Sequence, residues 1–234
     1  MKITPAQFAA MLDATNLRLD ATEADIRALC REAAAQHCAC VMIYPASVPL
    51  AARELSGSGV PIGTVIGFPS GRFTTAAKAA EIDAVAAAGA KEVDIVMNHA
   101  ALRDGHESEV AAELDALVSR AHKNGQIVKI ITENCYLTEA QMLVALRLCE
   151  DAGADFIKTS TGFGSAGAKP EHIALWARHR CGNIKLKAAG GIKTLRDALA
   201  LVDAGAERLG TSSAHALLTE LRGEKALSSQ QVEY

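Results

Sequence analysis

The chain has 234 residues, half of them hydrophobic, with a formal net charge of −3 at pH 7 and a pI near 6.2. This length fits one α/β barrel or two small domains, and the lack of a basic surplus together with an aromatic content of 4% argues against nucleic acid as a partner. Because no apolar run reaches the roughly 18 residues of a membrane span and the N-terminus carries no signal-peptide pattern, we expect a cytoplasmic protein without a membrane partner.

The first third of the chain alternates helical and apolar stretches. Residues 5–10 predict a short helix, which we expect to cap the bottom of a barrel, and residues 11–15 predict a short strand. A helical stretch follows at 21–36, and short apolar strands are predicted at 40–43 and 62–67.

Three later segments repeat one design, in which a helical run ends in Ala-Gly-Ala and a short apolar strand follows. The glycines are Gly89, Gly153 and Gly205, and glycine suits the left-handed position after a helix. Further strands are predicted at 127–132 and 184–189. The intervening helices are predicted at 75–88, 107–123, 139–151 and 194–203.

Apolar strands separated by helices imply parallel pairing through right-handed crossovers. An open doubly wound sheet and a closed barrel both fit, and the barrel requires residues 11–15 as its eighth strand. We favour a (β/α)8 TIM barrel, whose usual size is about 250 residues. No linker divides the sequence, so we expect a single barrel domain over residues 1–234, with a mobile polar tail from about residue 224.

Two lysines stand near the ends of predicted strands, where a barrel carries its active site. Lys158 ends the sixth strand and Lys187 lies in the seventh, with Lys185 one layer lower. If Lys158 and Lys187 face each other, repulsion and burial both lower a pKa, and a neutral amine attacks carbonyl carbon. Asp94, on the fourth strand, adds a group that handles protons. The alternative for such charged side chains is a polar packing layer closed by salt bridges, which stays an open reading for Lys129, Lys185 and Glu133.

Glycine-rich loops follow the seventh and eighth strands. Gly190 and Gly191 follow the first of these, and Gly210, Ser212 and Ser213 follow the second. Amide N–H groups at helix starts bind anions, and in barrels these two loops commonly hold phosphate. The sequence therefore predicts a phosphorylated small-molecule substrate.

The six cysteines lack CxxC spacing, and the seven histidines form no HxxxH pair. We expect free thiols, no metal and no cofactor.

The sequence resembles the deoxyribose-phosphate aldolase family along most of its length. The likeness is carried by DFIKTSTGF at 155–163, KLKAAGGI at 185–192 and GAERLGTSS at 205–213. Shorter matches are LDAT at 12–15, VMIYP at 41–45, IGFPSG at 66–71, EVDIV at 92–96 and KIITE at 129–133. Met42 departs from the pattern, because many members carry cysteine there.

The resemblance implies a class I, Schiff-base aldolase that reversibly cleaves 2-deoxy-D-ribose 5-phosphate to glyceraldehyde 3-phosphate and acetaldehyde. In that mechanism Lys158 forms the Schiff base, Lys187 perturbs its pKa and Asp94 assists proton transfer. The residues expected around the substrate are Asp13, Thr15, Thr159, Gly162, Gly190, Gly191, Gly210, Ser212 and Ser213. Some family members also end in tyrosine, which makes Tyr234 a candidate proton relay.

Two other functions stay open. One is another Schiff-base aldolase of sugar phosphates, and the other is a phosphate-binding barrel isomerase in which the lysines are structural. A homodimer is the default expectation for such an enzyme.

Overall fold

The protein, described here from a computed structural model over residues 3–223, is a closed barrel of eight parallel strands. The strands pair in sequence order, and the eighth closes on the first. They are β1 (Leu12–Asn16), β2 (Cys40–Ile43), β3 (Ile62–Ile66), β4 (Glu92–Val96), β5 (Ile127–Ile131), β6 (Phe156–Lys158), β7 (Lys185–Ala189) and β8 (Arg208–Thr211). The (β/α)8 fold predicted from the sequence is therefore confirmed, and the open sheet is not what forms.

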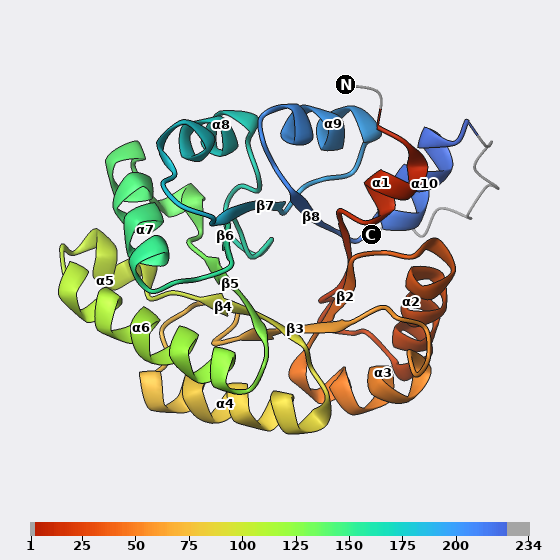
Figure 1. Cartoon of the computed structure of the whole chain (residues 1–234), viewed down its shortest axis with the longest axis horizontal. Helices are drawn as coiled ribbons and strands as arrows, with labels where there is room; N and C mark the ends of the chain where they lie inside the picture. Colours follow the sequence, from red (N-terminus) through yellow and green to blue (C-terminus); the bar gives the residue numbers. More distant parts are fainter. Residues whose placement is uncertain (1–2, 224–234) are drawn as a thin grey trace.

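Helices form a ring outside the barrel (Figure 1). They are α1 (Pro5–Ala9), α2 (Glu23–Gln36), α3 (Val48–Glu54), α4 (Thr75–Ala88), α5 (His99–Arg103), α6 (Glu107–Lys123), α7 (Glu139–Asp151), α8 (Pro170–His179), α9 (Leu195–Asp203) and α10 (Ala214–Leu221), with short 3-10 turns at Pro45–Ser47 and Asn134–Tyr136. The short N-terminal helix α1 is present and packs against α10, with Phe8 fully buried.

Most predicted elements match the structure within two or three residues. Helices α4, α6 and α7 have the predicted bounds, whereas β3 ends at Ile66 and β7 begins at Lys185. Helices α3, α5 and α8 occupy stretches to which the sequence assigned no helix. The first two have only seven and five residues, too few for a clear period of 3.6.

The three glycines of the repeated αβ design end their helices as predicted. Gly89, Gly153 and Gly205 have φ values of 111°, 75° and 114°, a region that side chains with a Cβ rarely enter. Each glycine therefore turns the chain from a helix into the next strand.

Alternation along the strands separates two environments. On β2, Val41 and Ile43 face outward into the large core beneath the helices, while Cys40 and Met42 face the barrel interior beside Leu17. The same alternation on β4, β5 and β7 directs charged side chains into the barrel. The apolar core thus holds the helices in place, and the interior is left for a polar site.

None of the helices within residues 3–223 combines the length and apolar character needed to cross a membrane. The single-domain organisation stays a prediction. The tail expected from about residue 224 and Tyr234 both lie outside the described residues.

Candidate active site

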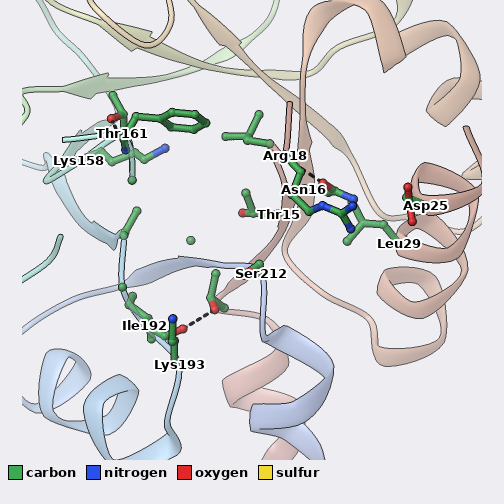
Figure 2. Close-up of a pocket in the computed structure, with 18 of the residues that line it drawn as sticks. Thr15, Asn16, Arg18, Asp25, Leu29, Lys158, Thr161, Ile192, Lys193 and Ser212 are labelled. Carbon is green, nitrogen blue, oxygen red and sulfur yellow. Dashed lines mark hydrogen bonds between the residues drawn. The ribbon is translucent and has the colours of Figure 1, made fainter. Parts of the chain in front are cut away.

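A cavity of about 540 Å³ opens at the C-terminal ends of the strands (Figure 2). Its walls come from the ends of β1, β6, β7 and β8, from the loops that follow them and from one face of α2. Lys158 and Thr161 lie at one side of the cavity, and Ile192, Lys193 and Ser212 lie at another. This is the end of the barrel at which the sequence predicted the site.

Lys158 and Lys187 meet at one carboxylate. Their register on neighbouring strands places them side by side, and each ammonium donates to Oδ2 of Asp94, at 2.6 Å from Lys158 Nζ and 2.7 Å from Lys187 Nζ. Lys158 lines the cavity, whereas Lys187 and Asp94 are fully buried below it. Of these three groups, Lys158 is therefore the one placed to reach a bound molecule.

More charged groups extend this cluster toward the other end of the barrel. Lys129 binds Oδ1 of Asp94 at 2.9 Å and Oε2 of Glu92 at 2.6 Å. Asp13 binds Lys187, and Arg208 joins Asp13 at 2.8 Å to Glu92 at 3.0 Å. The salt-bridge reading that the sequence left open for Lys129 describes its position well.

The cluster shifts the proton affinities of its members in opposite directions. Burial lowers the pKa of Lys158 to about 8, Asp94 opposes that shift and the charge of Lys187 adds to it. Burial alone would raise the pKa of Asp94, but Lys129, Lys158 and Lys187 hold it well below its usual value. Near neutral pH, Asp94 is therefore ionised, and an appreciable fraction of Lys158 is a free amine.

The residues predicted for the site fall into two groups. Seven line the cavity: Thr15, Lys158, Gly162, Gly190, Gly191, Gly210 and Ser212. Asp94 and Lys187 lie beneath it. Asp13 and Thr159 are fully buried, and neither they nor Ser213 line the cavity. Asp13 is held by Lys187 and Arg208, so its position fits support of the lysine pair better than contact with substrate hydroxyls.

The other polar residues at strand ends have structural partners. Glu133 is buried and accepts hydrogen bonds from the amide and hydroxyl of Thr161, which itself lines the cavity. Lys185 lies at the opposite end of β7, with its Nζ 5.6 Å from the centre of the Phe156 ring. Its predicted place one layer below Lys187 agrees with this position.

The two glycine loops meet at the cavity. Gly190 and Gly191 have φ values of 87° and 75° and leave backbone exposed along the wall. Oγ1 of Thr211 donates to the carbonyl oxygen of Ile192 at 2.7 Å, so the end of β8 is tied to the loop after β7 (Figure 2). Exposed backbone of this kind just before a helix is a common anion-binding arrangement, and the phosphate site expected here stays a prediction.

Two cationic side chains of the cavity were missed. Lys193 directly follows the Gly-Gly-Ile run, and Arg18 follows the first strand; both line the cavity. The signal was present for Lys193, because a lysine next to a predicted phosphate loop has a charge to offer. Arg18 lies on a loop that carries no motif.

Asp13, Cys40 and Glu92 place ligand atoms within 4.8 Å of one another, the spacing of a metal site. However, the two carboxylates already form ion pairs with Lys129 and Arg208, and these side chains supply the positive charge that a metal ion would otherwise provide. The expectation that the enzyme uses no metal stays a prediction.

A cavity at the C-terminal end of a closed barrel, lined by a lysine whose pKa is lowered by burial, is the arrangement that an enzyme acting through a lysine amine requires. The family model of the DeoC/LacD family aldolases matches residues 8–218. The chain belongs to this family and is therefore an aldolase, a carbon–carbon lyase.

Similar proteins agree with this assignment. A deoxyribose-phosphate aldolase of Micrococcus luteus is 42% identical over 93% of this chain and 98% of its own length. The crystal structure of a protein from Coccidioides immitis, described as a putative deoxyribose-phosphate aldolase, superposes with a TM-score of 0.90. It is 35% identical in sequence, and the match covers 94% of this chain and 87% of that one. The tetrameric deoxyribose phosphate aldolase of Aeropyrum pernix has a TM-score of 0.87 at 32% identity, over 94% and 92% of the two chains. An isomerase with purely structural lysines is not favoured.

Proposed function

We propose that the chain is a class I aldolase that reversibly cleaves 2-deoxy-D-ribose 5-phosphate to D-glyceraldehyde 3-phosphate and acetaldehyde. The observation that carries the proposal is the position of Lys158, which lines the cavity while burial lowers its pKa to about 8. A lysine that is partly neutral at physiological pH is the nucleophile that imine chemistry requires. The likeness to the Micrococcus luteus enzyme supports this substrate.

The reaction begins with addition of the Lys158 amine to the aldehyde carbon of the open-chain sugar. Loss of water gives a protonated imine, and its positive nitrogen accepts the electron pair of the breaking bond between carbons 2 and 3. The hydroxyl on carbon 3 loses its proton as glyceraldehyde 3-phosphate leaves. The remaining enamine takes a proton on carbon 2, and hydrolysis of the imine then releases acetaldehyde and the free amine.

Asp94 and Lys187 act together in the proton transfers of this reaction. Both oxygens of Asp94 already accept hydrogen bonds from lysines, and Asp94 is fully buried, so a proton from the substrate reaches it through water. Its low pKa makes Asp94 a weak base while three lysines surround it. Its larger effect is to hold Lys187 beside Lys158 and to stabilise the positive imine nitrogen.

The phosphate is held at the wall formed by the two glycine loops. Gly190, Gly191 and Ser212 line this wall, as does Lys193, which adds a positive charge. A phosphate dianion is stable in a partly buried site only where hydrogen-bond donors and a positive charge balance its own charge. We therefore assign the phosphate to this side of the cavity. The reacting aldehyde then lies toward Lys158, and the cavity of about 540 Å³ has room for both ends of the sugar.

Reduction of the enzyme with borohydride in the presence of acetaldehyde or deoxyribose 5-phosphate tests the proposal. We expect a stable secondary amine on Lys158, located by peptide mass spectrometry, and loss of adduct and turnover in Lys158→Arg, since a guanidinium stays protonated. An adduct on Lys187 instead would reverse the two lysine roles. Trapping with acetaldehyde but no turnover of deoxyribose 5-phosphate would favour another Schiff-base aldolase of sugar phosphates.

The proposal extends to the location and the assembly of the enzyme. A cytoplasmic location suits a substrate that is a phosphorylated sugar, and association into a homo-oligomer is supported by the tetramer of the Aeropyrum pernix protein. Size-exclusion chromatography with light scattering distinguishes the homodimer expected from the sequence from a tetramer.

A further inference from the structure

Among the described residues, the barrel interior at and beneath the cavity holds unequal numbers of positive and negative side chains. Its carboxylates are Asp13, Glu92 and Asp94, and its cations are Lys129, Lys158, Lys187 and Arg208. Every one of these groups makes an ion pair with another member. If all are ionised, the cations exceed the carboxylates by one, and the excess charge lies among buried side chains.

Glu92 and Arg208 lie at the end of this cluster farthest along the strands from the cavity. Glu92 is the first residue of β4 and Arg208 the first of β8, and neither lines the cavity. Glu92 reaches Asp94 through one ammonium, because Lys129 binds Glu92 at 2.6 Å and Asp94 at 2.9 Å. Arg208 reaches Lys187 through Asp13.

The excess charge is relieved when one lysine gives up its proton. Arginine does not, and Lys129 is enclosed by three carboxylates that hold its proton. Lys158 has a single carboxylate partner, Asp94, and shares the same oxygen with Lys187. It is therefore the group whose proton depends on the total charge of the cluster.

Besides Lys185, whose Nζ lies 5.6 Å from the centre of the Phe156 ring that Arg208 also contacts, two other titratable groups among the described residues lie near this region. Cys40 on β2 lies near Asp13 and Glu92, and burial keeps it a neutral thiol. Glu133, after β5, is paired with Thr161 and adds a carboxyl group within electrostatic reach of Lys158. Neither makes an ion pair with Glu92 or Arg208, so changes at those two residues act on Lys158 through the cluster itself.

We propose that Glu92 and Arg208 are positioning residues that set the pH at which Lys158 becomes a free amine, by contributing one negative and one positive charge to the barrel interior. This inference rests on the proposed role of Lys158 as the Schiff-base lysine. It gives Glu92 and Arg208 a role in tuning Lys158 as well as in packing. It also predicts that replacing these two residues, which bind each other, shifts the pH dependence of Lys158 in opposite directions.

The experiment measures the rate of borohydride-trapped acetaldehyde adduct on Lys158, and kcat/KM, as functions of pH in Glu92→Gln, Arg208→Gln and the double variant. Glu92→Gln removes a negative charge, so the acid limb should move to lower pH, whereas Arg208→Gln should move it to higher pH. Charges about 10 Å apart interact by roughly one pKa unit at an effective dielectric constant near 20, so shifts of about half to one pH unit are expected. The double variant should return close to the wild-type position.

Charge-preserving and surface variants control for damage to the fold. Glu92→Asp and Arg208→Lys keep the charges and should leave the limb near its wild-type pH. Glu207→Gln and Arg180→Gln break an exposed pair at 2.6 Å next to Arg208 in the chain and should not move it. Circular dichroism tests whether each variant is folded. If only one of the two single variants folds, it still tests the inference, because a definite direction of the pH shift is predicted for each.

Shifts in the same direction for both single variants, or no shift in a folded variant, would overturn the inference. Failure of the proposed function has a different signature. In that case the wild-type enzyme itself would show no trapped adduct on Lys158 at any pH.

Discussion

Lys158 and Lys187 donate to the same carboxylate oxygen, Oδ2 of Asp94, from adjacent positions on β6 and β7. One of them is open to the cavity and the other is sealed beneath it. Two ammonium groups that share one acceptor repel each other, so the shared oxygen holds Lys187 where it weakens the hold of Lys158 on its proton. In the proposed mechanism, the pair thus separates the reactive amine of Lys158 from the charge of Lys187 that lowers its pKa.

The pH dependence of the wild-type enzyme follows from Lys158. Its pKa in the folded protein is lowered to about 8, so the fraction of Lys158 that is a free, reactive amine is small well below that pH and increases as the pH rises through it. We therefore expect kcat/KM to rise as the pH increases through about 8 and then to level off. A profile that falls over this range, measured with a coupled assay for glyceraldehyde 3-phosphate, would contradict the assignment.

Replacing Lys187 by Met should reduce kcat by about 10²- to 10⁴-fold and move the acid limb upward. The shift has two causes, since Lys158 loses a repelling charge and gains a larger share of Asp94. Borohydride trapping on Lys158 should persist at higher pH, which separates tuning from loss of the nucleophile. Lys185→Met is the matched control, because Lys185 is an exposed lysine two residues earlier on the same strand and should keep near wild-type activity.

Replacing Lys193 by Met should raise KM for deoxyribose 5-phosphate about tenfold or more while changing turnover of unphosphorylated deoxyribose little. The reason is that Lys193 offers its charge on the cavity wall that carries the glycine loops, away from the reacting carbon. Ser213→Asp, which adds a negative charge beside the same loop, should act in the same direction. Equal losses on the two sugars would place the phosphate elsewhere.

Gly167→Ala should displace the Gly190 backbone, which lines the wall assigned to the phosphate. A Cβ at this position would lie 2.1 Å from the carbonyl oxygen of Gly190, and the neighbouring amide of Ala168 donates to that oxygen at 3.0 Å. We expect a loss of about 1–3 kcal/mol in the free energy of unfolding and a higher KM for the phosphorylated sugar. Thermal denaturation and steady-state kinetics on both sugars measure the two effects. A variant with unchanged stability and KM would show that the loop has room to move.

Removal of the residues from Ser228 onward tests the proton relay predicted for Tyr234, which lies outside the described residues. A phenol that protonates the enamine would leave imine formation intact while slowing exchange of the acetaldehyde methyl protons with solvent. Deuterium exchange followed by NMR, with Tyr234→Phe alongside the truncation, measures this step. Exchange at the wild-type rate in both variants would remove Tyr234 from the mechanism.

The sequence by itself favoured the closed barrel over an open sheet and identified Lys158 as the expected nucleophile. Local rules contributed most of this, because apolar strands of three to five residues alternate with helices, and Gly89, Gly153 and Gly205 mark three of the turns from a helix into a strand. Lys158 and the Gly190-Gly191 loop were recognisable because strand ends and glycine loops have fixed places in this fold.

Only the tertiary structure decided which charged residues contact the cavity and which support it. Asp13 was expected around the substrate, and the structure shows it buried between Lys187 and Arg208, residues 174 and 195 positions away in the chain. The network through Glu92 and Arg208 has no local signal, since each link joins different strands across the barrel. Its geometry depends on the closure of β8 onto β1, and strand register over such separations cannot be read from neighbouring residues.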